Sequence, residues 1–271
     1  MLEIFQYGFL LRALVVGLLV SLCAALLGVS LVLKRFSMIG DGLSHVGFGA
    51  LAIASALNLA PLQVSIPVVI VAAFILLRIS SDGKIKGDAA IALLSSSALA
   101  IGAIVISQTN SATDMNSYMF GSIMAISNDD LVLSIICSVI VIVMFVLFYN
   151  KIFAVTFDEN FSAATGVRVS RYNTLLAILT ALTIVLGMRI MGALLISSLI
   201  IFPALTSMRV FRSFRSVTIC SAVVSCVSYI IGIAITYYAD NFPAGASVVV
   251  ANLGMFLIFS LLGFLLRKKT Q

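Results

Sequence analysis

Nine apolar segments follow one another along the chain, separated by short polar stretches. They cover residues 7–33, 38–58, 62–79, 88–107, 130–149, 173–187, 190–207, 217–238 and 245–266. Runs of about this length cross a bilayer as helices, and their continuous apolar character disfavours a β-barrel, whose strands alternate. The pattern predicts an all-α, polytopic membrane protein of about eight or nine transmembrane helices, with residues 1–271 as one domain. The alternative to nine crossings is that one pair of segments is a re-entrant element.

The composition excludes a soluble domain of this length. Hydrophobic residues make up 62% of the chain and charged residues 10%, and the mean hydropathy is +1.23. The four cysteines lie in apolar segments without CxxC spacing, which is typical of small core residues. The net charge of +6 does not indicate a nucleic-acid partner, because the placement of the basic residues along the chain accounts for it.

The basic residues are distributed unevenly between the two sides of the predicted membrane protein. With the N-terminus outside, fourteen of the sixteen Lys and Arg residues fall on one side, and only Arg12 and Arg189 fall on the other. The positive-inside rule makes the rich side cytoplasmic, which predicts an exterior N-terminus and a cytoplasmic C-terminus. Arg209, Arg212 and Arg215 form a basic cytoplasmic face suited to anionic membrane lipid or an acidic partner.

An ionisable pair interrupts the second apolar segment. His45 is the one histidine of the chain, and Asp41 lies four residues before it. On a helix these positions share a face, so that a carboxylate oxygen and an imidazole nitrogen converge, a ligand set suited to zinc, manganese or ferrous iron. Two ligands do not close a site, but they suit the weak, passing binding of a translocation path. The alternative is a polar pair that satisfies a neighbouring helix.

The longest predicted cytoplasmic loop, about residues 150–172, contains a short helix. The residues that define it are Phe157, Asp158, Glu159, Phe161, Ala164 and Gly166. The two acidic residues favour the N-terminal end of the helix and the glycine its C-terminal end, while the aromatic residues and the alanine share one face. Exposed aromatic residues on such a helix suit docking of a soluble partner. The alternative is a helix that lies on the lipid interface.

Two further stretches depart from a regular membrane helix. Residues 117–127 lie between polar ends and are too short to span, so we expect an interfacial or re-entrant helix on the outer face. In the seventh segment Pro203 removes a helical hydrogen bond, with Ser197 and Ser198 about one turn before the break. An ordinary kink is the simpler interpretation; if the helix breaks to line a cavity, these three residues belong to a polar path.

Four stretches together resemble the permease subunits of bacterial ABC importers for zinc, manganese and iron, the ABC-3 metal-ion permease family. They are SMIGDGLSHVGFGA at 37–50, SYMFGSIMAIS at 117–127, FDENFSAATGV at 157–167 and MGALLISSLIIFPALTS at 191–207, with PAGASVVV at 243–250 as a weaker fifth. Their order and spacing fit across nearly the whole chain. The stretch at 191–207 makes the chain most similar to the zinc-importer permeases.

The resemblance implies a multi-pass protein of the bacterial plasma membrane. Such a permease pairs with itself as a homodimer, binds two copies of a cytoplasmic ATPase and receives metal from an extracytoplasmic metal-binding protein. The family's metal-contacting residues map onto Asp41 and His45, and its coupling loop maps onto 157–167 with Gly166 at the turn. Some relatives carry more histidines along the path, so that here the partner copy, hydroxyls or water must complete the coordination.

The resemblance also implies the source of energy. The chain is not an enzyme, since no G-x-x-x-x-G-K-[ST] sequence for ATP binding occurs in it, and hydrolysis falls to the separate ATPase. The divalent metal is cargo and not a permanent cofactor: zinc is expected, with manganese or iron as alternatives. The metal passes the pair by alternating access.

Two other classes of function use the same residues differently. In a secondary metal transporter driven by an ion gradient, Asp41 and His45 act as a proton relay, but the segments hold few other charges to support one. A membrane scaffold for a signalling or assembly complex leaves the spacing of the pair unexplained.

Overall fold

The computed structural model describes residues 8–81, 87–108, 121, 128–193, 195–238 and 242–270. All regular structure in these residues is helical, which confirms the all-α prediction. The helices are α1 (Gly8–Leu33), α2 (Ile39–Ala56), α3 (Pro61–Ser81), α4 (Gly87–Gln108), α6 (Asn128–Leu147), α7 (Tyr149–Phe157), α8 (Glu159–Ala164), α9 (Val169–Met191), α10 (Ile196–Met208), α11 (Phe214–Tyr238) and α12 (Ala244–Thr270).

Each predicted apolar segment coincides with a helix, but the helices differ in length and hydropathy. Within the described residues, six helices (α1, α4, α6, α9, α11 and α12) are long and apolar enough to cross a membrane. The apolar part of α3 and the whole of α10 are shorter, and α2 contains Asp41 and His45. The number of crossings therefore stays a prediction. The expected outer helix at 117–127 lies outside the described residues except for Gly121.

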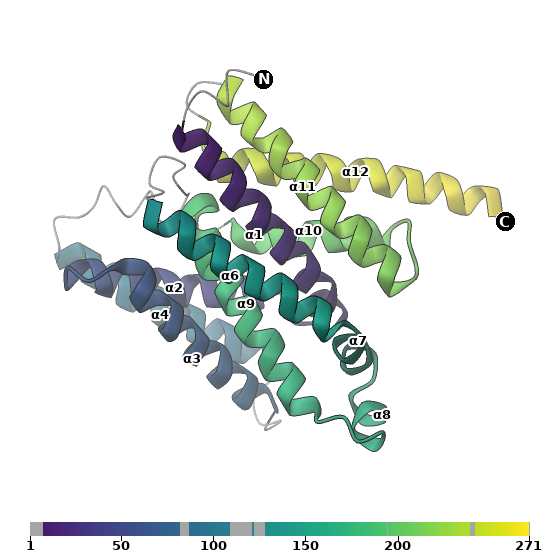
Figure 1. Cartoon of the computed structure of the whole chain (residues 1–271), viewed down its shortest axis with the longest axis horizontal. Helices are drawn as coiled ribbons and strands as arrows, with labels where there is room; N and C mark the ends of the chain where they lie inside the picture. Colours follow the sequence, from purple (N-terminus) through teal and green to yellow (C-terminus); the bar gives the residue numbers. More distant parts are fainter. Residues whose placement is uncertain are drawn as a thin grey trace.

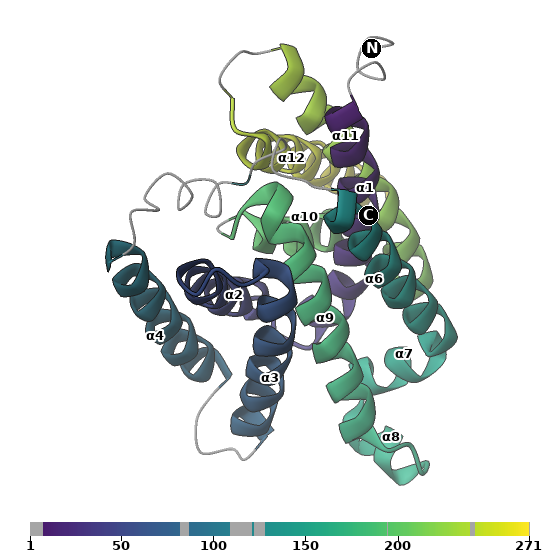
Figure 2. The same ribbon diagram turned by 60° about the vertical axis from the view of Figure 1, so that its left-hand side comes forward.

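Helix α9 runs through the middle of the molecule. Figures 1 and 2 show α2, α3 and α4 on one side of it and α1, α6 and α11 on the other, and α9 contacts α1, α2, α3 and α6. One continuous apolar core includes buried residues of all these helices, which explains why the chain forms a single packed unit. Helix α12 packs on α10 and α11, and its C-terminal part extends beyond the other helices in Figure 1.

Hydroxyl groups join α1 to α11 in the apolar interior. Ser221 donates to the carbonyl of Ala25 at 3.3 Å, and Ser225 donates to the carbonyl of Ser21 at 2.9 Å. Tyr229, which is fully buried, donates to the carbonyl of Ala13 at 2.7 Å. Lipid tails are as apolar as the side chains of membrane helices, so the hydrophobic effect does not hold these helices together. Packing and hydrogen bonds between helices contribute instead. These bonds fix α1 in place, and α1 leads directly into α2.

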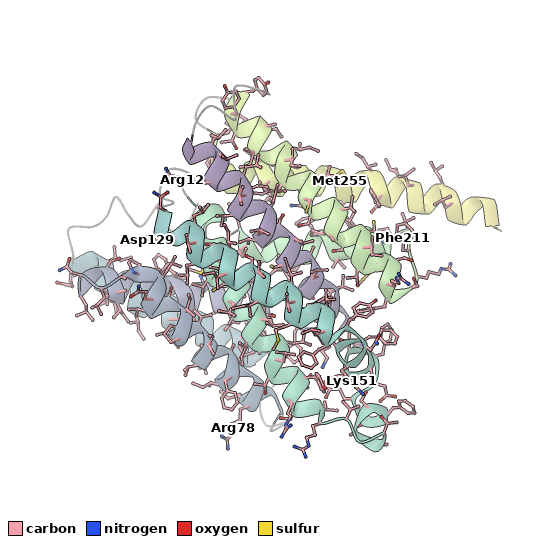
Figure 3. The ribbon with its side chains drawn as sticks, in the orientation of Figure 1. Arg12, Arg78, Asp129, Lys151, Phe211 and Met255 are labelled. Atoms are coloured by element: carbon pink, nitrogen blue, oxygen red, sulfur yellow. The ribbon has the colours of Figure 1, made fainter. Side chains whose placement is uncertain are left out.

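The two ends of the bundle carry different charges. Figure 3 shows Arg12 and Asp129 near one end, and Arg78 and Lys151 at the opposite end. This separation agrees with the uneven distribution of basic residues along the sequence. The predicted orientation, with the end near Arg78 and Lys151 in the cytoplasm, remains an expectation from the positive-inside rule.

The predicted boundary between the sixth and seventh apolar segments is wrong. The seventh segment was expected to begin at residue 190, but α9 continues to Met191 and ends at Gly192, whose φ is +85°. A turn follows, in which the amide of Leu195 donates to the carbonyl of Gly192 at 3.3 Å, and α10 begins at Ile196. The chain therefore breaks before α10, while Pro203 is accommodated inside that helix. The left-handed backbone that glycine permits ends α9 at that position.

The predicted short helix of the loop is also divided. Phe157 is the last residue of α7, and Asp158 adopts an extended backbone at φ −150° and ψ 103°. Its side chain accepts a hydrogen bond from the amide of Phe161 at 2.9 Å, which caps α8. A residue that caps a helix in this way cannot itself be helical. The expected shared face of Phe157, Phe161 and Ala164 on one helix is therefore wrong.

Candidate functional site

Asp41 and His45 lie together on a partly open face of α2. His45 Nε2 is 3.7 Å from Asp41 Oδ2, and the two side chains are 12% and 33% exposed. Most other residues of α2 are buried against α3, α4, α9 and α10. Asp41 occupies the first turn, where a carboxylate is favoured by the partial positive charge of the helix N-terminus. The sequence spacing therefore does bring the two side chains together.

The N-terminal end of α2 is held close to α10. A Cβ added at Gly40 would lie 3.1 Å from Ile200 Cδ1 and 3.4 Å from Ser197 Cα, so the two helices are in close contact there and a larger residue would require the end of the Ile200 side chain to shift. Ser44 is buried and donates to the carbonyl of Asp41 at 2.8 Å, which closes the first turn of α2. The pair is thus carried on a first turn that packing and hydrogen bonding hold in place.

The three residues proposed for a path around Pro203 are placed differently from one another. Ser197 lies beside Gly40, next to the turn that carries Asp41. The hydroxyl of Ser198 donates to the carbonyl of Leu195 at 2.6 Å, within the turn that starts α10. Pro203 is buried within α10. Of these three, Ser197 is the residue that the fold brings next to Gly40, which precedes Asp41.

Among the described residues, no group of three or more His, Cys, Asp or Glu side chains is placed to hold a metal ion. The described chain therefore offers one carboxylate and one imidazole at this place. Such a set is open and weak, in contrast to the closed four-ligand sites that hold structural zinc.

The region around α7 and α8 forms a separate surface at the end of the bundle. Phe157 and Phe161 are 60% and 65% exposed. Phe157 is held by ring contacts, with centroids 4.9 Å from Phe153 and 6.0 Å from Phe214. Gly166, at φ +83°, ends the turn after α8, as expected from the sequence. Two exposed aromatic rings, one of them held by neighbouring rings, suit a docking surface.

Lys34 and Asn173 are two residues of this region that sequence reasoning did not assign. Lys34 Nζ donates to Glu159 Oε1 at 2.6 Å and to Asn173 Oδ1 at 2.5 Å. Asn173 Nδ2 donates to the same Glu159 oxygen at 3.1 Å. No local sequence pattern predicts these hydrogen bonds, because Lys34 is separated from Glu159 and Asn173 by more than a hundred residues.

The charge of Glu159 depends on these bonds. Partial burial raises the pKa of its carboxyl group, but the hydrogen bond and positive charge of Lys34, with the Asn173 hydrogen bond, outweigh burial. The pKa of Glu159 therefore lies below its ordinary value of 4.5, and the carboxylate is charged near neutral pH.

Comparison with known proteins identifies the family. The model of the ABC 3 transport family matches residues 6–263, which is nearly the whole chain. The chain belongs to the ABC 3 transport family. It is therefore an integral membrane permease of a metal-ion ABC importer of the bacterial plasma membrane, and a separate subunit hydrolyses ATP.

Two curated relatives and one solved structure extend the comparison. The manganese import system permease ScaB of Streptococcus gordonii is 30% identical over 93% of this chain and 91% of its own length. The high-affinity zinc uptake membrane protein ZnuB of Haemophilus influenzae is 29% identical over 93% of this chain and 97% of its length. The structure of PsaBC from Streptococcus pneumoniae in complex with Fab matches with a TM-score of 0.84 at 30% identity, covering 95% and 94% of the two chains. The sequence identities to the manganese and zinc permeases are nearly equal, so they do not show which metal this chain transports.

Proposed function

We propose that this ABC 3 permease imports zinc, and that the metal passes between Asp41 and His45 during alternating access. The observation that carries the proposal is the convergence of one carboxylate and the single imidazole on a partly open face of an otherwise buried helix. Ionisable groups inside a membrane domain are costly, and by default they mark a pathway.

The geometry and chemistry of the pair support zinc over manganese. Two ligand atoms of a tetrahedral zinc site lie roughly 3.4 Å apart when each is about 2.05 Å from the metal. Asp41 Oδ2 and His45 Nε2 are 3.7 Å apart, so a small adjustment of either side chain suffices. An imidazole ligand favours zinc, while manganese prefers oxygen ligands and ranks lower in intrinsic affinity. Iron(II) and manganese(II) remain the alternative cargoes.

A second copy of the chain completes the coordination in this proposal. One chain contributes two ligands, and the partly exposed Asp41 and His45 are accessible for a ligand from outside the chain. A two-fold symmetric homodimer presents the same residues from both copies. Two carboxylates and two imidazoles make a transient four-ligand site, which opens when the copies move apart.

The surface formed by Phe157 and Phe161 serves as the docking site of the ATPase. A few large side chains carry most of the binding energy of a typical interface, and the exposed rings of Phe157 and Phe161 are suited to this role when a partner covers them. A binding protein delivers metal at the opposite end. In this arrangement ATP binding and hydrolysis act on α7 and α8, while the metal is held at α2.

The decisive experiment is metal uptake into cells that lack their own high-affinity zinc and manganese importers. The permease is supplied with its binding protein and with either the active ATPase or a hydrolysis-deficient ATPase. We expect zinc uptake with the active ATPase and none with the deficient one. Uptake of manganese or iron instead would change the assigned substrate but leave the proposed mechanism intact. Uptake that is equal with both ATPases would overturn the coupled mechanism in favour of a gradient-driven transporter.

The role of the pair is tested by Asp41→Ala and His45→Ala in the same cells. Each variant removes one of two ligands, so zinc uptake should fall at least about tenfold at limiting metal. The control is Asp129→Ala, which removes a carboxylate that also lies in the first turn of its helix but is exposed near the other end of the molecule. Unchanged uptake in both Asp41→Ala and His45→Ala, at equal amounts of protein in the membrane, would show that metal does not pass this pair.

A further inference from the structure

The connection between α1 and α2 is a short, hydrogen-bonded link of residues 34–38. The amide of Lys34 donates to the carbonyl of Ser30 at 3.0 Å, and that of Phe36 donates to Leu31 at 2.9 Å. The amides of Ile39 and Gly42 continue the chain of bonds to Phe36 at 3.1 Å and Met38 at 3.0 Å. The side chain of Lys34 is therefore attached through a stiff segment to the first turn of α2, where Asp41 lies.

Helix α8 has few other attachments to the bundle. Of its six residues, Ser162 is the one that is buried. Among the described residues, Glu159 is the side chain of α8 that bonds to other elements, and its partners Lys34 and Asn173 come from the α1–α2 link and from α9. Glu159 and its partner Asn173 also line a cleft of about 400 Å³, together with Phe74, Arg78 and Ser170. Glu159 is thus bonded to the bundle through its carboxylate and borders open space.

The three-residue network joins α8 to both elements that approach the candidate metal site. Through Lys34 it connects to the α1–α2 link and Asp41. Through Asn173 it connects to α9, which leads into α10 and Ser197 beside Gly40. The Lys34 side chain is only 6% exposed, so its ammonium group depends on these two acceptors for solvation. A displacement of α8 therefore either pulls Lys34 along with Glu159 or breaks their hydrogen bond. Breaking it is costly, because it leaves the buried ammonium group of Lys34 without one of its two acceptors.

We propose that Lys34, Glu159 and Asn173 form the link through which movement of α8 is transmitted to the metal pair on α2. They are positioning residues, since none of them contacts the metal. This inference rests on the proposed function and adds to it the route of coupling between the ATPase surface and the metal site. Loss of the link leaves the ATPase able to bind and hydrolyse ATP, but movement of α8 no longer reaches Asp41.

The test measures two rates in proteoliposomes that contain the whole importer, with ATPase and binding protein: zinc uptake and ATP hydrolysis. The variants are Lys34→Met, which keeps the length of the side chain without its charge, and Glu159→Gln, which keeps the shape of the acceptor. We expect the zinc moved per ATP to fall at least about fivefold in each. The double variant should be no worse than the more severe single variant, because the link is already broken once.

Two controls separate transmission from simple loss of folding. Lys34→Arg keeps a cation that can donate to both acceptors, so it should retain most of the coupling. Arg212→Met removes an exposed cation from the segment between α10 and α11, outside α7 and α8, and should leave zinc per ATP unchanged. If Lys34→Met does not reach the membrane, Glu159→Gln decides the question alone, because that side chain is about half exposed and tolerates the change.

The outcomes are distinct. Zinc per ATP equal to wild type in Lys34→Met or Glu159→Gln would overturn the proposed link while leaving the importer function intact. A proportional fall of both rates, together with a lower melting temperature, would assign the network to stability and would also overturn it. A wild-type importer that moves no metal with ATP would contradict the proposed function itself, and this inference would fall with it.

Discussion

Helices α2 and α12 are two apolar helices of the same bundle with opposite surroundings. Helix α2 is covered by α3, α4, α9 and α10, and thirteen of its eighteen residues are buried. Helix α12 packs on α10 and α11, and only 22% of its most apolar stretch is buried. The polar pair Asp41 and His45 is on α2, whereas α12 exposes large apolar side chains such as Leu257 and Leu261. The comparison teaches that an apolar sequence can specify either a lipid-facing surface or the support of a polar site.

The two helices also use glycine differently. A Cβ at Gly49 of α2 would lie 2.7 Å from the backbone oxygen of Ala98, so the backbones of α2 and α4 touch there. A Cβ at Gly254 of α12 would meet no atom within 4 Å. A cation contributes near each helix: Lys34, just before α2, pairs with Glu159, and Arg209 lies over the middle of α12, with its Cζ 5.1 Å from the centroid of the Phe256 ring.

The largest effect is expected from Gly49→Val. The new side chain meets backbone atoms of α4 that cannot rotate away, so α2 and α4 must separate, at a cost of about 3 kcal/mol. Thermal unfolding of the purified permease in detergent should show a clearly lower midpoint, and uptake should fall if α2 carries the proposed metal ligands Asp41 and His45. A midpoint unchanged from wild type would mean that the two backbones are not in contact in the native protein.

A smaller effect is expected from Arg209→Gln, which removes the cation from the face of the Phe256 ring. Because Arg209 is exposed, the loss should be about 0.5–1 kcal/mol. Arg212→Gln removes the same charge three residues later and serves as the matched control. Equal midpoints for these two variants in the unfolding experiment would contradict a specific contribution of the ring contact to α12.

The ion pair near α2 differs from the Arg209 contact in its dependence on pH. The lowered pKa of Glu159 means that its carboxylate stabilises the fold above the ordinary value of 4.5, and that this contribution is lost as the pH falls through the lowered pKa. Because Glu159 is about half exposed, Glu159→Gln should cost only about 0.5 kcal/mol at pH 7.

The pH series for this prediction runs from pH 7 to about 3.5, the acidic range in which a glutamate titrates. The difference in midpoint between wild type and Glu159→Gln should close at the acidic end, while the difference for Arg209→Gln should persist, since arginine keeps its charge. A Glu159→Gln difference that is constant with pH would show that the carboxylate charge does not stabilise this end of the molecule.

The smallest effect is expected from Gly254→Val, the same substitution as at Gly49 but at an open position of α12. It should change stability by no more than about 0.5 kcal/mol. Because both variants replace glycine with valine in a helix, the difference between their stabilities measures the effect of the surrounding atoms at each position. A large loss of stability at Gly254 would indicate that this face of α12 is covered in the native protein, for example by a second copy of the chain.

The sequence predicted the local features of this protein well. Nine apolar runs coincide with helices, Asp41 and His45 meet because four residues make about one helical turn, and Asp158 and Gly166 delimit α8. It missed the turn at Gly192 that separates α9 from α10, because the apolar pattern continues through that turn, while Pro203 lies inside α10 without ending it. It also placed Phe157 and Phe161 on one helix, whereas Asp158 ends α7 after Phe157 and caps α8, which carries Phe161.

The amino-acid sequence by itself determined that the chain is helical, belongs in a membrane and carries one possible metal-ligand pair. These properties follow from composition and from spacings within one turn of helix, which the backbone geometry fixes locally. Only the tertiary structure decided that Lys34 reaches Glu159 and Asn173, that Ser197 lies beside Gly40, and that Gly49 is crowded while Gly254 is not. Those contacts join residues far apart in the chain, and they depend on which helix faces pack together, which no local pattern records.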